Sequence, residues 1–256
     1  MQNTLFFGHM DAAELMFYIF ALFFLGLVIW LRREDRREGY PLETDVGGHL
    51  LNNDGLLQMA TPKTFHLPFD QGSVTTPTKG RESIDVPNAR RTAPWAGSPL
   101  EPTGSGIGAG VGPGAWAARS DTPDLTHEGQ PRIVPIGGTG IVVEGRDPDP
   151  RGMKVLGVDG AVAGTVADLW VDRSEMMIRY LDVSVGDKSV LLPMTMALVD
   201  RRRGVVHCSA LKGSQFAGAP GVAKAGIVTR LEEEKITAYF GSGYLYSSPG
   251  RSEPYL

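Results

Sequence analysis

The chain contains 256 residues, with a net charge of −4 at pH 7 and a pI near 5.8. This acidic balance gives no indication of a nucleic-acid partner, which is typically bound by a basic surface. A single cysteine, Cys208, excludes an intramolecular disulfide framework and agrees with a cytoplasmic location. The 33 glycines and 18 prolines make up about a fifth of the residues, which predicts a long irregular segment.

Residues 12–31 form one long apolar run, in which Glu14 carries the only charge. A helix of this length spans roughly 30 Å, the thickness of the hydrocarbon core of a bilayer. Apolar residues surround the whole helix, whereas the core helix of a soluble protein usually alternates polar and apolar faces. We therefore predict a transmembrane helix at residues 12–31, which is retained and not cleaved as a signal peptide.

Basic residues lie on only one side of this run. None precedes it, whereas four arginines follow it closely: Arg32, Arg33, Arg36 and Arg37. By the positive-inside rule, we expect residues 1–11 to form a tail outside the cell membrane and all residues after 31 to lie in the cytoplasm.

Residues 32–150 form an extended segment whose recurring prolines disfavour long helices and central strands. Its glycine-rich stretch, residues 104–114, fits neither the dinucleotide fingerprint nor the phosphate-binding loop, which favours a flexible or surface-hugging loop. Trp95, Trp116 and residues 133–136 are too apolar for free disorder. We expect the segment to lie on partner subunits and to be ordered chiefly by them.

Residues 151–212 change to short alternating runs separated by turn residues such as Gly160. Val166, Asp168 and Trp170 are expected on one face of a strand in this region. Four or five short strands, joined by turns at about ten-residue spacing, predict a small antiparallel barrel.

Residues 213–256 form a C-terminal segment with one predicted helix, at residues 230–240. Thr229 and Glu232 have the spacing of a capping box, in which each side chain accepts a backbone N–H of the other residue. Gly241 is expected to end the helix, because glycine readily adopts the left-handed conformation that follows a helix.

The chain shows acidic clusters but no pattern of metal ligands or nucleophiles. Its five histidines are scattered, and it contains neither a Cys-x-x-Cys pair nor a Gly-x-Ser-x-Gly elbow. Each carboxylate alone is most often a solvated side chain, but a chain of carboxylates, histidine and water also relays protons. The residues alone leave both interpretations open for the acidic side chains beside the predicted turns and strands, which are Asp121, Asp124, Glu128, Asp168, Asp172, Glu175 and Asp182.

Six longer motifs occur in a defined order: LRREDRREGYPLE (31–43), PKTFHLP (62–68), VGPGAWAAR (111–119), IVPI (133–136), DPDPRGM (147–153) and GTVADLWVDRSE (164–175). IRYLDV, LLPM, EEEKITAY and GYLY follow them. This series resembles the H subunit of the purple-bacterial photosynthetic reaction centre over nearly the whole chain. The resemblance implies a single N-terminal transmembrane α-helix and a mainly-β cytoplasmic domain. That domain would contain a small antiparallel β-barrel of the PRC type, a long irregular segment and a short C-terminal helix.

The resemblance also implies a non-catalytic function. In this family the H subunit caps the cytoplasmic face of the L and M subunits, which hold the bacteriochlorophylls, bacteriopheophytins, quinones and non-haem iron. No cofactor or metal is therefore expected on this chain itself. The family role is to shield the quinone sites from water and to support proton delivery to the secondary quinone during light-driven cyclic electron transfer. We expect the chain in the bacterial inner membrane or the intracytoplasmic chromatophore membrane, beside antenna polypeptides and lipids.

Candidate proton-path residues follow from the matching motifs. Glu175 matches the family glutamate near the proton path of the secondary quinone, and Asp172 and Arg179 match its charged neighbours. Asp124 matches a carboxylate near the outer entrance of the path.

The chain departs from the family pattern at the predicted entrance. Some relatives carry a pair of surface histidines at positions that correspond to Glu128 and Gln130, whereas this chain has His127 alone between Thr126 and Glu128. His127 and Glu128 therefore complete the set of candidate residues.

Two other classes of function compete with this interpretation. A membrane-tethered PRC-barrel protein could serve as an adaptor or assembly factor of another membrane complex, but such a protein has no need for the REGYPLE and PKTF motifs. A self-contained enzyme is disfavoured because the sequence lacks a nucleophile, metal or nucleotide constellation.

Overall fold

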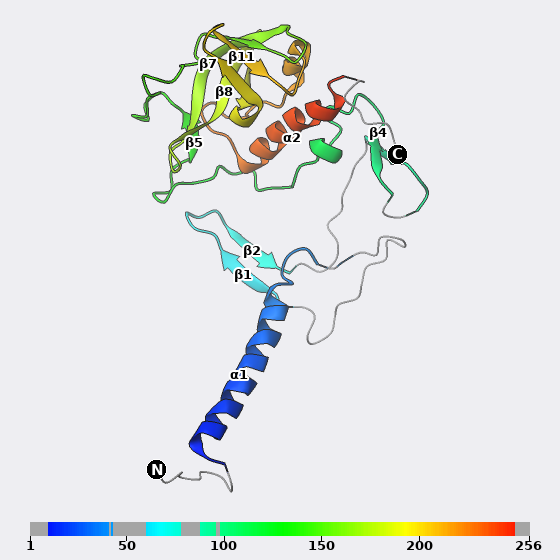
Figure 1. Ribbon diagram of the computed structural model, residues 1–256, viewed down its shortest axis with the longest axis vertical. Helices are drawn as coiled ribbons and strands as arrows, with labels where there is room; N and C mark the ends of the chain where they lie inside the picture. The colour runs from blue at the N-terminus through cyan, green and yellow to red at the C-terminus, as the bar shows by residue number, and fades with distance from the viewer. Residues whose placement is uncertain (1–9, 41, 43–59, 78–87, 96–97, 249–256) are drawn as a thin grey trace. The chain divides into compact units, whose positions relative to one another are not determined.

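A computed structural model describes residues 10–40, 42, 60–77, 88–95 and 98–248 (Figure 1). The chain divides into two compact units, one of residues 1–84 with 95–97 and the other of residues 85–94 with 98–256. Some predicted regions lie outside the described residues: most of the N-terminal tail (1–9), parts of the irregular segment (41, 43–59, 78–87 and 96–97) and the end of the C-terminal segment (249–256).

The N-terminal unit begins with helix α1 (Ala12–Glu34), which confirms the predicted apolar helix and continues it for three residues beyond residue 31. The Asp11 side chain caps the helix by accepting the backbone N–H of Glu14 at 2.9 Å. None of the helix residues is buried within the protein, although most are apolar. The helix is long and apolar enough to cross a membrane, which would remove this surface from water.

A short hairpin completes the described part of this unit. Strands β1 (Lys63–His66) and β2 (Ser73–Thr76) pair antiparallel, with Lys63 opposite Thr76. In the turn between them, Phe69 and Asp70 have φ angles of 57° and 55°, which non-glycine residues rarely adopt. The apolar side chains of this hairpin remain largely exposed.

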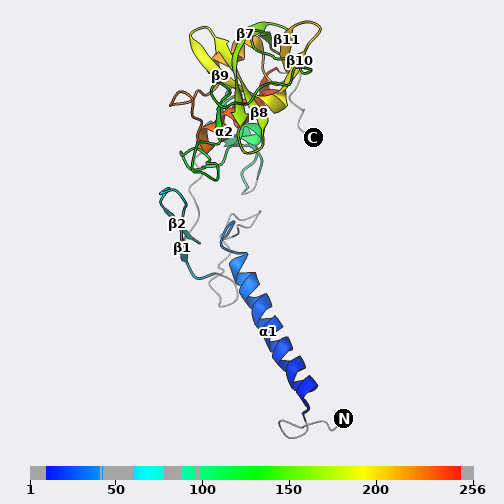
Figure 2. The same cartoon turned by 90° about the vertical axis from the view of Figure 1, so that its left-hand side faces the viewer.

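The C-terminal unit contains a mixed seven-stranded sheet and a separate strand pair, β3 (Ala89–Arg91) with β4 (Leu100–Pro102). The sheet order is β10–β11–β6–β7–β8–β9, and β5 also pairs with β7. Only the β11–β6 pair is parallel, and Figure 2 shows β9 separated from β10 and β11. The sheet strands are β5 (Ile133–Pro135), β6 (Lys154–Leu156), β7 (Val162–Asp172), β8 (Met177–Val185), β9 (Lys188–Pro193), β10 (Ala197–Asp200) and β11 (Val205–Cys208).

The predicted face of β7 is wrong at Val166. A register shift lies between Val166 and Asp168, so Val166 pairs with Val183 while Asp168 pairs with Asp182. An extra residue at such a β-bulge moves the following side chains to the other face of the strand. Val166 therefore lies on the face opposite Asp168 and Trp170, and both Val166 and Trp170 are buried.

The core of this unit lies between the sheet and helix α2 (Arg230–Tyr246), which contacts β9 (Figure 1). The rings of Phe216 and Phe240 pack edge to face, with their centroids 5.4 Å apart. Phe216 comes from the 3₁₀ helix η3 (Gly213–Gly218) and Phe240 from α2. The largest fully buried side chains are Phe216, Phe240, Leu169, Leu181, Leu192, Leu211 and Ile236.

Helix α2 begins as predicted but does not end at Gly241. The reciprocal capping box of Thr229 and Glu232 is confirmed, with Thr229 Oγ1 accepting the Glu232 N–H at 3.1 Å. The helix continues to Tyr246, because Gly241 and Gly243 allow close packing rather than termination. A Cβ atom added to Gly243 would lie 2.6 Å from the carbonyl oxygen of Ala210.

The glycine-rich stretch lies against α2 as a surface-hugging loop. It contains the 3₁₀ helix η1 (Gly112–Gly114), which contacts α2. A Cβ atom at Gly106 would lie 2.3 Å from the ring of Tyr246, and Val111 is buried. The irregular segment from residue 98 onward therefore packs against its own chain, in addition to any partner that covers it.

Candidate functional site: the carboxylates around Arg132

Strand pairing brings together the acidic residues that lie far apart in the sequence. β5 pairs with the end of β7, with Ile133 opposite Asp172, and the backbone N–H of Arg173 donates to the carbonyl of Arg132 at 3.0 Å. Arg132 thereby lies directly beside the turn between β7 and β8, which contains Glu175. The adjacent residue, Met176, has a φ angle of 54°, so this turn is tight.

The guanidinium group of Arg132 is the centre of the site. It contacts the carboxylates of Asp124 at 3.2 Å and Asp172 at 2.8 Å, and it also pairs with Glu175. The three carboxylate side chains differ in exposure: Glu175 is 51% exposed, Asp124 39% and Asp172 0%. The site therefore runs from solvent into the interior of the C-terminal unit.

Asp172 is held in its ionised form. Its Oδ1 atom accepts the backbone N–H groups of Ser174 at 2.9 Å and Glu175 at 3.0 Å. Burial acts to raise the pKa of Asp172, but the Arg132 guanidinium and these backbone donors outweigh burial and hold the pKa below its usual range. Asp172 therefore fixes the turn and the position of Arg132, and it is poorly suited to exchange a proton near neutral pH.

A second acidic residue, Glu233, has a raised pKa, whereas the pKa of Asp172 is lowered. The hydroxyl of the buried Tyr180 donates to Oε2 of Glu233 at 2.9 Å. Burial raises the pKa of Glu233, and the negative charge of Asp124 adds to this effect. Burial also raises the pKa of Tyr180, so its hydroxyl remains a donor. A carboxyl group with a raised pKa can hold a proton closer to neutral pH.

A polar cavity of 390 Å³ connects the two groups. Asp124, Arg179, Tyr180 and Glu233 all line it, together with Arg119, Arg230, Glu234 and Thr237. Asp124 belongs both to the cavity wall and to the Arg132 cluster. The arrangement supplies neighbouring groups that accept, hold and release protons, and the cavity is large enough for water.

The structure gathers some of the predicted residues and separates others. Asp124, Asp172 and Glu175 meet at Arg132, and Arg179 lines the cavity. Glu175 forms its ion pair with Arg132, a residue that the motifs did not indicate.

His127 and Glu128 lie at another depression, a 500 Å³ cavity that Arg173 and Ser174 also line. The Thr126 hydroxyl and the backbone lower the pKa of Glu128. Arg173 and Ser174 follow Asp172 directly in the chain, so this depression lies beside the β7–β8 turn.

Sequence reasoning missed Arg132, Tyr180 and Glu233. The Glu232–Glu234 run was visible as helix-stabilising charge, but nothing in the sequence placed Glu233 beside Tyr180, which is 53 residues away. Among the described residues, no group of three or more histidine, cysteine or acidic side chains could hold a metal ion.

Two known protein families match this chain. A family model of the photosynthetic reaction centre H-chain N-terminal region matches residues 4–138, more than half of the chain, and a PRC-barrel domain model matches residues 143–215. The chain belongs to the H-chain family of the photosynthetic reaction centre. The H chain is a pigment-free structural subunit that associates with the L and M subunits. The family and the one apolar helix found in the described part of the chain indicate a single-pass membrane protein.

The Arg132 cluster joins the two matched regions of this H chain. Asp124 and Arg132 lie in the H-specific region, whereas Asp172 and Glu175 lie in the PRC-barrel region. The site therefore depends on the combination of the two regions, and a PRC barrel alone would lack its central cation.

Proposed function

We propose that this H chain caps the cytoplasmic face of the L and M subunits and supports proton delivery to their secondary quinone. Two-electron reduction of a quinone consumes two protons, and a quinone site shielded from water needs polar groups that lead inward. The chain itself is non-catalytic, and the bacteriochlorophylls, bacteriopheophytins, quinones and iron reside in the partner subunits. Antenna polypeptides and membrane lipids are expected neighbours of α1.

The observation that carries this proposal is the gradient of acidic groups around Arg132. Glu175 and Asp124 are exposed enough to exchange protons with water, and Asp124 also faces the cavity that contains Glu233. Glu233, with its raised pKa, can store a proton, while the ionised Asp172 holds the geometry. Arg179 lines the cavity and adds positive charge, which counters the repulsion among the carboxylates.

His127 and Glu128 are proposed as a second contact with solvent beside the same turn. They share a cavity with Arg173 and Ser174, which follow Asp172. Glu128 corresponds to one of the two positions at which some relatives carry histidines, and His127 precedes it, so a single histidine and a carboxylate would serve as the entrance here.

The proposed orientation places the residues before α1 in the periplasm and the C-terminal unit in the cytoplasm. It rests on the arginines that follow the apolar run and the absence of basic residues before it. Protease added to sealed right-side-out cells should spare everything after residue 31. Cleavage of the C-terminal unit from the periplasmic side would contradict this orientation.

Glu175→Gln in assembled complexes tests proton delivery. The substitution keeps the size of the side chain but removes its charge and its exchangeable proton. We expect a slower second electron transfer to the secondary quinone after paired flashes, with charge separation and reduction of the primary quinone unchanged. Glu144→Gln, which removes a carboxylate outside the cluster, is the matched control. An unchanged second transfer across pH in a Glu175→Gln complex that still assembles would remove Glu175 from the path.

A further inference from the structure

The junction between α1 and the β1–β2 hairpin gathers cations that lie far apart in the sequence. Arg32 and Arg33 occupy the last turn of α1, and Lys63 comes from the start of β1. The ammonium group of Lys63 lies 5.8 Å from the ring centroid of Trp30. Lys63 is therefore held at the level of the last apolar residues of the helix.

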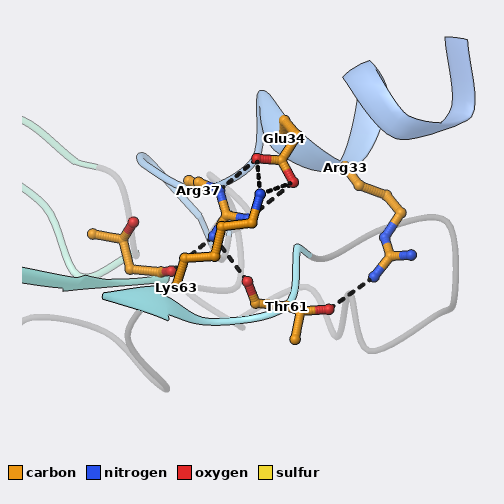
Figure 3. Close-up of polar contacts among 6 residues, drawn as sticks. Arg33, Glu34, Arg37, Thr61 and Lys63 are labelled. Atoms are coloured by element: carbon orange, nitrogen blue, oxygen red, sulfur yellow. Dashed lines mark hydrogen bonds and ion pairs between the residues drawn. The ribbon is translucent and has the colours of Figure 1, made fainter. Parts of the chain in front are cut away.

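Arg37 fixes this geometry by joining the end of the helix to Thr61, just before β1, and to the end of β2 (Figure 3). Its Nε and Nη2 atoms donate to the Glu34 carboxylate at 2.8 and 2.9 Å. Its Nη1 atom donates to the backbone carbonyls of Thr61 at 2.8 Å and Thr76 at 2.9 Å. The Arg37 side chain is only 10% exposed, so its role is to hold the junction together.

Two further cations of this junction stay accessible, because the side chains of Arg32 and Lys63 are 63% and 49% exposed. Glu34 receives hydrogen bonds from Lys63 at 3.2 Å as well as from Arg37, so two cations share one carboxylate. The Arg33 guanidinium donates to the Thr61 hydroxyl at 3.2 Å, and Arg32 lies 3.8 Å from Asp35 with most of its side chain exposed. Residues 32–38 and Lys63 together carry five basic and three acidic side chains, a net charge of +2.

The position of these residues at the end of α1 indicates which kind of ligand they would meet. An apolar helix that crosses a bilayer places the residues at its end among the lipid headgroups, and tryptophan and arginine are typical of this layer. Phosphate groups of anionic lipids lie in the same layer and attract adjacent basic side chains. An acidic segment of a partner protein fits less well, because the short loops of membrane proteins on the arginine-rich side are themselves basic.

We propose that Arg32, Arg33 and Lys63, with Trp30, form a binding surface for the headgroup of an anionic phospholipid. Arg37 is the positioning residue that brings Lys63 to the end of α1. The proposal requires only that α1 spans a membrane and is independent of proton delivery. It assigns the hairpin a function at the membrane surface that its small buried area does not otherwise explain.

Native mass spectrometry of the full chain in mild detergent tests this proposal. The probes are short-chain phosphatidylglycerol and phosphatidylcholine with the same acyl chains. We expect preferential binding of phosphatidylglycerol, which Arg32→Gln/Arg33→Gln/Lys63→Gln should weaken roughly a hundredfold, at about fivefold for each basic residue. The control Arg201→Gln/Arg202→Gln/Arg203→Gln removes the same charge from the β10–β11 turn and should retain the preference.

A charge-preserving variant and a salt titration distinguish the loss of a charged binding surface from misfolding. Arg32→Lys/Arg33→Lys/Lys63→Arg should retain the preference for phosphatidylglycerol, and added NaCl should weaken binding to the wild type. Equal binding of both lipids by the wild type, or equal losses in the two glutamine variants, would overturn the proposal. It would also be overturned if the first glutamine variant lost its L and M partners while its lipid binding stayed unchanged.

Discussion

The two units of this H chain are each organised by an arginine, but among the described residues only the C-terminal unit has a hydrophobic core. In the N-terminal unit, Arg37 joins α1 to the hairpin, while the apolar side chains of both elements are exposed. In the C-terminal unit, Arg132 holds three carboxylates above a sheet whose interior is fully buried. The described apolar side chains of the first unit are therefore available to a membrane and to partner subunits, whereas those of the second pack against one another.

Replacing one phenylalanine by alanine in each unit should give the largest difference in the free energy of unfolding. Phe240→Ala removes a fully buried ring and should lower the free energy of unfolding by about 3–5 kcal/mol. Phe69→Ala removes a ring that is 52% exposed and should change it by less than about 0.5 kcal/mol. Urea unfolding of the full chain in mild detergent can be followed by fluorescence, because Trp170 is the buried tryptophan among the described residues. Similar losses in the two variants would break the distinction between the units.

Replacing Arg132 should destabilise the C-terminal unit, whereas replacing Arg37 should not. Arg132→Gln leaves the buried Asp172 without its cation and should cost about 3 kcal/mol, the lower end for a buried pair because Arg132 is partly exposed. Arg37→Gln should release the hairpin from α1, with less than about 0.5 kcal/mol of effect on unfolding of the C-terminal unit. The tryptophan signal of the isolated chain reports the first effect, and amide exchange of β1 and β2 in the assembled complex with L and M reports the second. A loss of sheet stability in Arg37→Gln would show that the units are coupled.

A smaller effect is expected in the pH dependence of stability, which should distinguish Glu233, whose pKa is raised, from Asp172, whose pKa is lowered. The pKa of Glu233 is raised by burial, so its contribution to stability is present below its ordinary value of 4.5 and is lost as the pH rises through the folded-state value. Glu233→Gln lacks this loss and should become more stable relative to the wild type as the pH rises from 4 to 8.

Asp172→Asn provides the contrast with the opposite sign. The lowered pKa of Asp172 contributes stability above the ordinary value of 3.8, and this contribution disappears as the pH falls through the folded-state value. The deficit of Asp172→Asn should therefore be largest near neutral pH and should close in acid. Parallel pH profiles of the two variants would contradict the assigned electrostatics.

Features that depend on local sequence could be predicted, and those that depend on long-range packing could not. The composition of residues 12–31 predicted α1, and the Thr229–Glu232 spacing predicted the start of α2. The bulge in β7 is a backbone event that alternation does not reveal, so Val166 was assigned to the wrong face. Gly241 was interpreted from its local preference, whereas the packing of α2 on its neighbours carries the helix to Tyr246.

The candidate site shows the same limit. The family motif indicated Asp124, Asp172 and Glu175 as separate residues, but their common partner Arg132 emerges only when β5 pairs with β7. The Tyr180–Glu233 hydrogen bond likewise needs α2 to pack beside the sheet.

Hydrogen exchange of the full chain, alone in micelles and in the assembled complex with L and M, tests the difference between the units most directly. Amides that pair β7, β8 and β9 should be protected in both states, because their hydrogen bonds are covered by the core of this chain. Amides of β1 and β2 should exchange rapidly in the isolated chain and become protected in the complex. Equal protection of the hairpin in both states would contradict the proposal that the partner subunits order it.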